Sequence, residues 1–294
     1  MIKLAIIGAE NTHAWQFASA LNGKNNKKLF DDVELLGVYA DISTQDGKIG
    51  VAKIKELSCC TMFANSYDEF IDDADAVMIT LRDGAMHLQA AQKYIRKGIP
   101  VWIDKPFACS KEEVCKMINM AQMYKCPLTG GSAIPRLPDV KEFIKKISAF
   151  DKDITGGHIT APANMVNNYG GFWFYTQHLV QMMTATFGND VIGVRAFKDD
   201  NGVTAIYFYN EFSVTARFGA GYSICVYDKC SSAHIKEIKI NTSTYFLPEL
   251  YDFYNVIKTG ESDMTEKDIA APVFIIEATI NSYLNNKFVK IETI

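Results

Sequence analysis

The seven cysteines of this 294-residue chain form no metal-binding or disulfide pattern. Their number is odd, and no two of them have the C-x-x-C spacing. This excludes an obvious disulfide framework and gives no sign of a structural zinc site. Free thiols are the expected state, which favours a reducing, cytoplasmic location. The cysteines are Cys59, Cys60, Cys109, Cys115, Cys126, Cys225 and Cys230.

Long apolar runs and an excess of positive charge are also absent. No run approaches the roughly 18 apolar residues that a membrane span needs. The apolar start of the chain is short, is interrupted by Lys3 and meets a glycine at Gly8, so it does not resemble a signal peptide. The formal net charge is -4, and there is no basic stripe of the kind that nucleic-acid-binding proteins carry. We expect a soluble protein with neither a membrane nor a nucleic acid as partner.

The first half of the chain alternates short apolar runs with amphipathic stretches. The alternation predicts parallel strands covered by helices on both faces, which is a doubly wound Rossmann-type sheet. A capping pair, Ser66 and Glu69, predicts one further short helix. The predicted strands are 2–7, 33–41, 61–63, 76–80, 99–103 and 127–130, and the predicted helices are 13–21, 48–57, 86–97 and 111–124.

The second half has a different pattern, with strand-like runs in series separated by polar turns. It predicts an α+β domain with a mostly antiparallel, open sheet and helices on one face. We place the boundary so that residues 1–127 form the Rossmann domain and residues 128–294 the second domain. The predicted strands are 154–160, 191–197, 203–209, 213–218, 224–227 and 234–240, and the predicted helices are 139–149, 172–187, 248–258 and 266–284.

Ligands of doubly wound sheets bind beyond the carboxyl ends of the strands. The first such end is the loop from Gly8 to His13, where dinucleotide-binding proteins carry G-x-G-x-x-G. Only Gly8 matches, because Glu10 and His13 replace the second and third glycines. A carboxylate about 5 Å from a phosphate costs roughly 3 kcal/mol at an effective dielectric near 20. The loop is therefore either a degenerate cofactor site, formed by Gly8, Glu10, Asn11, Thr12 and His13, or a turn without a ligand.

Asp41 ends the second predicted strand. An acidic residue there can accept hydrogen bonds from the adenosine ribose hydroxyls and repels a 2′-phosphate. It favours NAD over NADP. A turn or helix-cap aspartate is the alternative interpretation.

Several motifs together resemble the glucose–fructose oxidoreductase and inositol dehydrogenase family, Gfo/Idh/MocA. The stretch 76–108 resembles the family segment with a threonine at a strand end, a histidine at a helix start and a final E-K-P. Thr80, His87 and the sequence Asp104-Lys105-Pro106 occupy these positions, with aspartate in place of glutamate. The segment 247–291 resembles the end of family members, so the likeness covers nearly the whole chain.

This resemblance implies NAD(P)-dependent hydride transfer to or from a secondary alcohol of a sugar or polyol, with no metal required. It implies that Thr80, His87, Asp104 and Lys105 line the cofactor site. Lys105 would lie beside the nicotinamide and the reacting hydroxyl, where its charge can stabilise a developing alkoxide. The second sheet commonly forms the oligomer interface in the family, which implies a homodimer or homotetramer.

The second-half motif of the family, D-x-x-x-H-x-x-D, is only partly present. His178 matches the histidine, the usual general acid or base. Phe174 and Gln181 replace the two aspartates. Tyr175, three residues before His178 on the same helix face, is a further candidate to donate a hydrogen bond to substrate.

Two main hypotheses follow. The first is an NAD-dependent oxidoreductase that uses Lys105, His178 and Tyr175. The second is a non-catalytic or repurposed family member that binds a sugar or nucleotide as a sensor or scaffold, motivated by Glu10, His13 and Phe174. Lyase or hydrolase chemistry with a retained cofactor is a third possibility.

Overall fold

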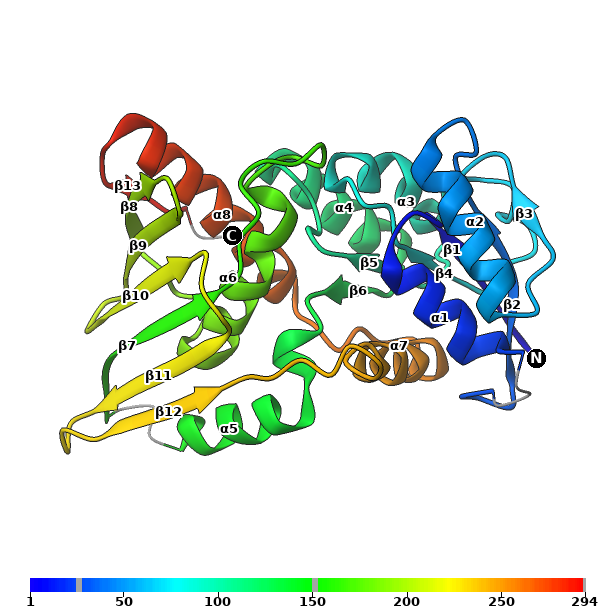
Figure 1. Ribbon diagram of the computed structural model, residues 1–294. Helices are drawn as coiled ribbons and strands as arrows, with labels where there is room; N and C mark the ends of the chain where they lie inside the picture. Colours follow the sequence, from blue (N-terminus) through cyan, green and yellow to red (C-terminus); the bar gives the residue numbers. More distant parts are fainter. Residues whose placement is uncertain (25–27, 150–152, 293–294) are drawn as a thin grey trace. The chain divides into compact units, whose positions relative to one another are not determined.

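The computed structural model describes residues 1–24, 28–149 and 153–292, which divide into two compact units built from separate stretches of chain. The first unit comprises Met1–Asp104, Cys115–Gly130 and Glu249–Met264, and the second comprises Lys105–Val114, Gly131–Pro248 and Thr265–Ile294. The units are discontinuous in sequence, and the single domain boundary after residue 127 stays a prediction. Figure 1 shows the elements of both units.

A six-stranded sheet forms the centre of the first unit, with the strand order β3-β2-β1-β4-β5-β6. The pairs β2–β3, β1–β2, β1–β4 and β4–β5 are all parallel. Strands β2 and β3 are added on one side of β1, and β4, β5 and β6 on the other. The strand order therefore reverses between β1 and β4, which is the switch point of a Rossmann sheet. The predicted fold class is confirmed. The strands are β1 Ile2–Ile7, β2 Val33–Tyr39, β3 Phe63–Ala64, β4 Ala76–Ile79, β5 Val101–Asp104 and β6 Leu128–Gly131.

Helices flank this sheet, and α1 packs beside α2 (Figure 1). Four of the predicted helices are confirmed to within three residues at each end. The short helix predicted from Ser66 and Glu69 is wrong: the segment forms turns, and the Glu69 carboxylate accepts a hydrogen bond from the Asn65 N–H at 2.8 Å. The helices are α1 Thr12–Asn22, α2 Gln45–Leu57, the 3-10 turn η1 Gly84–Met86, α3 His87–Arg96 and α4 Lys111–Tyr124.

One helix of the first unit comes from near the end of the chain. Helix α7, Leu247–Thr259, buries Leu250, Phe253 and Val256. The hydroxyl of Tyr254 and the ammonium of Lys258 both donate hydrogen bonds to the Asp32 carboxylate, just before β2. The sequence predicted this helix but assigned it to the second domain.

The second unit is built on a seven-stranded sheet with the order β12-β11-β7-β10-β9-β8-β13. Its pairs are antiparallel except β7–β10, which is parallel, so the prediction of a mostly antiparallel sheet is confirmed. Strand β13 was not predicted. The strands are β7 Ile154–Ala161, β8 Gly193–Asp199, β9 Gly202–Phe208, β10 Ser213–Phe218, β11 Ser223–Asp228, β12 Ala233–Glu237 and β13 Val289–Lys290.

The two faces of this sheet differ. Apolar rows such as Val214, Tyr207 and Val194 are fully buried on the face that packs against α6 and α8. The row on the opposite face includes His158, Thr215 and Ile235, which are partly or largely exposed. The sheet is therefore open on one side. The helices of this unit are η2 Ile134–Arg136, α5 Pro138–Ser148, α6 Trp173–Phe187 and α8 Glu266–Asn285.

Candidate functional site

The turn after β1 has the backbone conformation and the close backbone contact that require a glycine at its first position. Gly8 has φ 118°, and a Cβ there would lie 2.4 Å from the Leu81 nitrogen. The Thr80 hydroxyl, at the end of β4, donates a hydrogen bond to the Gly8 carbonyl at 2.8 Å. The structure therefore brings Gly8 and Thr80 together at the switch point of the sheet.

Glu10, in the second glycine position, is held by the loop after β4. Its carboxylate accepts a hydrogen bond from the Arg82 backbone N–H at 3.0 Å. The Arg82 guanidinium donates to the Glu10 carbonyl and pairs with Asp46 of α2 at 3.2 Å. Burial raises the pKa of Glu10, and the hydrogen bond and positive charge of Arg82 oppose that rise. The carboxylate is thus turned toward the segment after β4, where Arg82 offsets part of its charge.

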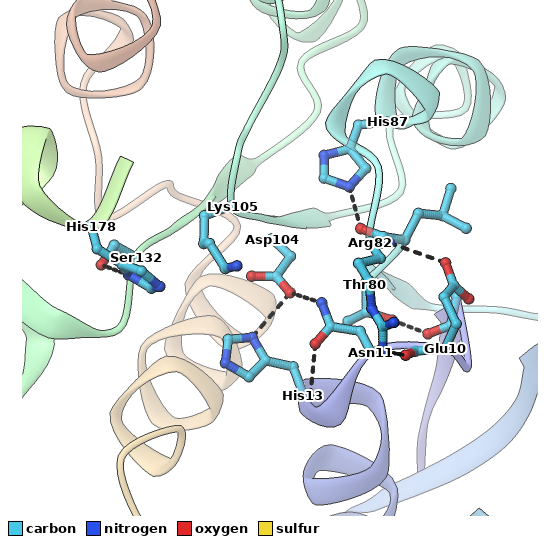
Figure 2. Close-up of polar contacts among 12 residues, drawn as sticks. Glu10, Asn11, His13, Thr80, Arg82, His87, Asp104, Lys105, Ser132 and His178 are labelled. Carbon is cyan, nitrogen blue, oxygen red and sulfur yellow. Dashed lines mark hydrogen bonds and ion pairs between the residues drawn. The ribbon is translucent and has the colours of Figure 1, made fainter. Parts of the chain in front are cut away.

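His13, in the third glycine position, pairs with Asp104 (Figure 2). Its Nδ1 lies 3.0 Å from the Asp104 Oδ2, and the Asn11 side-chain amide donates to the same oxygen at 2.6 Å. All three side chains are buried. Asn11 also caps α1, because its side-chain oxygen accepts from the His13 N–H. The Asp104 carboxylate thus gives the imidazole a buried partner at a helix N-terminus, where the helix dipole by itself disfavours positive charge.

Two of the predicted cofactor residues lie at the surface. Asp41 is exposed, and its carboxylate accepts hydrogen bonds from the backbone N–H and hydroxyl of Ser43. Asp41 therefore closes its own turn ahead of α2, which agrees with the alternative interpretation without excluding a ligand on the outer oxygens. Thr12 is exposed at the first residue of α1.

His87 is fully buried at the start of α3. Its Nε2 lies 2.8 Å from the Leu81 carbonyl, and since a carbonyl only accepts, Nε2 must carry the hydrogen. This bond fixes the segment after β4 that also contains Arg82. Figure 2 shows His87, Arg82 and Thr80 along this segment.

In the second unit, Lys105 directly follows Asp104 and is held by helix α6. Its Nζ donates a hydrogen bond to the Phe174 carbonyl at 3.2 Å. It also lies 4.3 Å from the ring centroid of Phe174 and 4.8 Å from that of Tyr175. The ammonium thus lies over the faces of two aromatic rings and gains cation–π attraction from them.

His178, one turn further along α6, is paired with a residue that the sequence did not indicate. Its Nδ1 lies 2.7 Å from the hydroxyl of Ser132, as Figure 2 shows. The Tyr175 ring lies 5.3 Å from the imidazole, so the predicted neighbours Tyr175 and His178 do meet. Ser132 is the first residue after β6, so applying the strand-end rule to the last strand of the Rossmann sheet would have found it.

Gln181 occupies the position of the second missing aspartate and joins a buried amide network. Its Oε1 accepts from the Ser132 N–H at 2.6 Å and from the Gln177 amide at 3.0 Å. The Gln177 Oε1 accepts from the Phe107 N–H at 2.6 Å. A Cβ on Gly131 would lie 2.4 Å from the Gln181 Oε1, so this contact requires glycine. The side-chain amides of Gln177 and Gln181 therefore connect the Phe107 backbone to Ser132, the residue that is hydrogen-bonded to His178.

Comparison with known proteins agrees with these two units. A Rossmann sheet together with a unit built on an open, mostly antiparallel sheet is the fold that this chain shares with several solved dehydrogenases. Residues 2–132 match the Gfo/Idh/MocA family, described as an oxidoreductase family with an NAD-binding Rossmann fold. The match covers the Rossmann part of the chain, and over that part the predicted resemblance to the family is confirmed.

Solved structures extend the likeness in fold to the whole chain. Myo-inositol 2-dehydrogenase from Lactobacillus plantarum is 14% identical, with a TM-score of 0.81 and 99% of each chain covered. Apo scyllo-inositol dehydrogenase from Lactobacillus casei is 15% identical, with a TM-score of 0.79, over 99% of this chain and 98% of that one. Levoglucosan dehydrogenase, solved with NADH and levoglucosan, is 12% identical, with a TM-score of 0.79, over 99% and 100%. No curated protein matches the sequence.

None of the helices among the described residues combines the length and apolar character needed to cross a membrane. Within the same residues, no three His, Cys, Asp or Glu side chains are grouped so that they could hold a metal ion.

Proposed function

We propose that the protein is an NAD-dependent oxidoreductase that acts on a secondary alcohol of a sugar-like or polyol substrate. The observation that carries the proposal is the arrangement on helix α6. Lys105 is bound to the Phe174 carbonyl, His178 lies one turn further on, and Tyr175 contacts both. The ammonium of Lys105, the imidazole of His178 and the phenol of Tyr175 therefore lie at one face of α6. Groups of these types can transfer a proton to or from a substrate hydroxyl. The family match over the Rossmann part and the named substrates of the structural neighbours support the same reaction class.

The residues of the first unit fit a dinucleotide. Gly8 keeps the tight turn at the switch point, and Glu10 is turned toward Arg82. The residues that would hold the cofactor are Gly8, Glu10, Asn11, Thr12, His13, Asp41, Thr80, His87, Asp104 and Lys105. The exposed carboxylate of Asp41 supports NAD over NADP, because it can accept from ribose hydroxyls and repels a 2′-phosphate. When bound, the nicotinamide would take or return the hydride of the substrate C–H bond.

The catalytic roles fall to three side chains. Lys105 places a positive charge where an alkoxide develops and can exchange the hydroxyl proton. His178 is the second proton-handling group, and Tyr175 donates a hydrogen bond to the substrate. Lys105 and His178 are both largely buried, so water competes little for these contacts.

Titration with NADH and NADPH, followed by nicotinamide fluorescence, tests the proposal. We expect binding of NADH, weaker binding of NADPH, and turnover with an inositol or sugar. Lys105→Ala should abolish turnover while cofactor binding persists, whereas the matched surface variant Lys53→Ala should behave like the wild type. Absence of NADH binding at millimolar concentration would contradict the proposal, and retained turnover in Lys105→Ala would remove that residue from the mechanism.

A second candidate is a family member that binds a ligand without catalysis. It is supported by the carboxylates of Glu10, Asp41 and Asp46 near the dinucleotide loop, because they oppose an anionic pyrophosphate and Arg82 offsets only part of their charge. Calorimetric titration with inositols and sugars, without cofactor, separates the candidates. Sugar binding together with a failure to bind NADH would favour this one.

The open face of the second sheet supports assembly into a homodimer or homotetramer. Ile235 is largely exposed there and continues the cross-strand row of Thr215, His158 and Cys225. Light scattering should give a mass of two or four chains. Ile235→Glu should shift it toward the monomer, while Val166→Glu should not, because Val166 is even more exposed but lies outside the strands. A monomeric wild type would contradict this assembly. A cytoplasmic location, and the lack of a nucleic-acid or membrane partner, stay predictions.

A further inference from the structure

The hydroxyl of Ser132 has a restricted set of partners. Ser132 is completely buried, and its Oγ accepts a hydrogen bond from the Ile134 N–H at 3.1 Å. Its other polar neighbour is the His178 Nδ1 at 2.7 Å. Throughout the part of the chain that the structure describes, Ser132 Oγ has no third polar partner.

This restriction decides which atom donates between Ser132 and His178. The Ile134 N–H can only donate, so it takes an oxygen lone pair and leaves the hydroxyl hydrogen to be placed. A buried hydroxyl hydrogen without an acceptor is unfavourable. Nδ1 of His178 is the acceptor within reach, so the Ser132 O–H donates to it. A neutral imidazole that accepts at Nδ1 carries its own hydrogen on Nε2.

We propose that Ser132 is a positioning residue that holds His178 in the Nε2–H tautomer, so that His178 presents a hydrogen-bond donor to the substrate oxygen. The neutral network places Ser132 firmly: its backbone N–H is bound to Gln181, which is bound in turn to Gln177.

The catalytic consequence rests on the proposed function, although the tautomer itself does not. In alcohol oxidation the C–H bond breaks and its electron pair leaves as hydride, which a bound nicotinamide would accept. The O–H bond breaks, its proton goes to a base, and the C=O bond forms. With Nε2 already protonated, that base would be Lys105 in its neutral amine form, which becomes the ammonium as it takes the proton. His178 stabilises the developing negative charge on oxygen through its Nε2–H.

Nitrogen-15 NMR of the full-length protein measures the tautomer directly. The chain has five histidines, so a histidine-labelled sample gives few signals, and His178→Gln assigns the one of interest. At a pH where the imidazole is neutral, we expect a protonated Nε2 and an unprotonated Nδ1. An Nδ1–H tautomer in the wild type would overturn the proposal, and this measurement needs neither cofactor nor substrate.

Variants of Ser132 test its role. Ser132→Ala should move His178 away from the pure Nε2–H form, and Ser132→Thr, which keeps the hydroxyl, should restore it. Ser282→Ala is the matched control: Ser282 is equally buried and bonds to Ala196 and Lys287, so its loss should leave the His178 signals unchanged. An unchanged tautomer in Ser132→Ala would overturn the proposal. Should Ser132→Ala fail to fold, the wild-type spectrum still decides.

Kinetics then separate this inference from the proposed function. Ser132→Ala should lower kcat about tenfold while KM stays within about twofold, because the donor acts mainly on the transition state. If no nicotinamide cofactor binds, the proposed function fails while the tautomer result stands. If the cofactor binds and the wild type has the Nδ1–H tautomer, the oxidoreductase stands and the role given to Ser132 fails.

Discussion

The buried pair of His13 and Asp104 allows a quantitative prediction. The Nδ1–Oδ2 distance is 3.0 Å, and the side chains are 4% and 0% exposed. Two unit charges at that distance attract by about 5 kcal/mol at an effective dielectric near 20. Removing one partner of a buried pair costs about 3–5 kcal/mol, because the other charge stays buried. We expect His13→Ala to destabilise the first unit by that amount.

Part of this loss would come from packing, since the imidazole also lies 5.6 Å from the ring of Phe17. A double-mutant cycle with Asp104→Asn isolates the pair. The coupling free energy should reach about 3 kcal/mol if both groups are charged, against about 1 kcal/mol for a neutral hydrogen bond. The matched control is His234 with Asp228, a pair of the same type at 2.9 Å that is more exposed. Its coupling should be much smaller, because solvent screens it.

Urea unfolding followed by tryptophan fluorescence provides the measurement. Trp173 belongs to the second unit, so a Trp173→Phe background leaves Trp15 and Trp102 to report on the first. The control pair lies in the second unit and is measured with Trp173, after Trp15 and Trp102 have been replaced by Phe. The Trp102 ring lies 6.5 Å from that of His13, close to the altered pair. A coupling below about 1 kcal/mol, or equal to that of the control pair, would refute the charged-pair interpretation.

Three further predictions concern single positions. Gly8→Ala should cost about 3 kcal/mol, because φ is 118° and the added Cβ meets the Leu81 backbone. Gly221→Ala, in the second unit and with nothing within 4 Å of the added Cβ, should be nearly neutral when Trp173 reports the urea unfolding. NADH affinity, followed by fluorescence, should strengthen as pH falls through the raised pKa of Glu10, because protonation removes a charge that opposes the pyrophosphate. Glu10→Gln should abolish that dependence, and an unchanged pH profile would contradict the effect. Hydrogen bonding to an arginine lowers the pKa of Asp199 to about 2, so its stabilising effect is present above pH about 4 and is lost as pH falls toward 2. Asp199→Asn should make the free energy of unfolding fall less steeply with decreasing pH in that window. An equally steep fall in the variant would contradict this prediction.

The fold was largely predictable because apolar periodicity is a local property. Each strand of the Rossmann sheet is a short apolar run, and each helix has one apolar face, so order and class followed from the alternation. The segment at Ser66 and Glu69 failed because a capping pattern can also close a turn. Strand β13 was missed because two residues carry no period.

The candidate site was predictable only where strand ends identify it. Gly8, Thr80 and Lys105 follow that rule, and the structure brings Gly8 and Thr80 together. The partners could not be predicted, because they depend on pairs far apart in sequence: His13 with Asp104 across 91 residues, and Ser132 with His178 across 46. The sequence showed that aspartates were missing beside His178. It could not show that a serine and two glutamines stand in their place.

Helix α7 has a consequence for biosynthesis. The Rossmann sheet is complete when Gly131 has been synthesised, yet the helix that buries Leu250 and Phe253 in the same unit arrives more than a hundred residues later. A nascent chain must therefore keep an apolar surface uncovered while most of the second unit is made. Such late, long-range closure slows folding and exposes intermediates to aggregation. Residues 1–130 expressed alone should accordingly depend on chaperones far more than the full chain does.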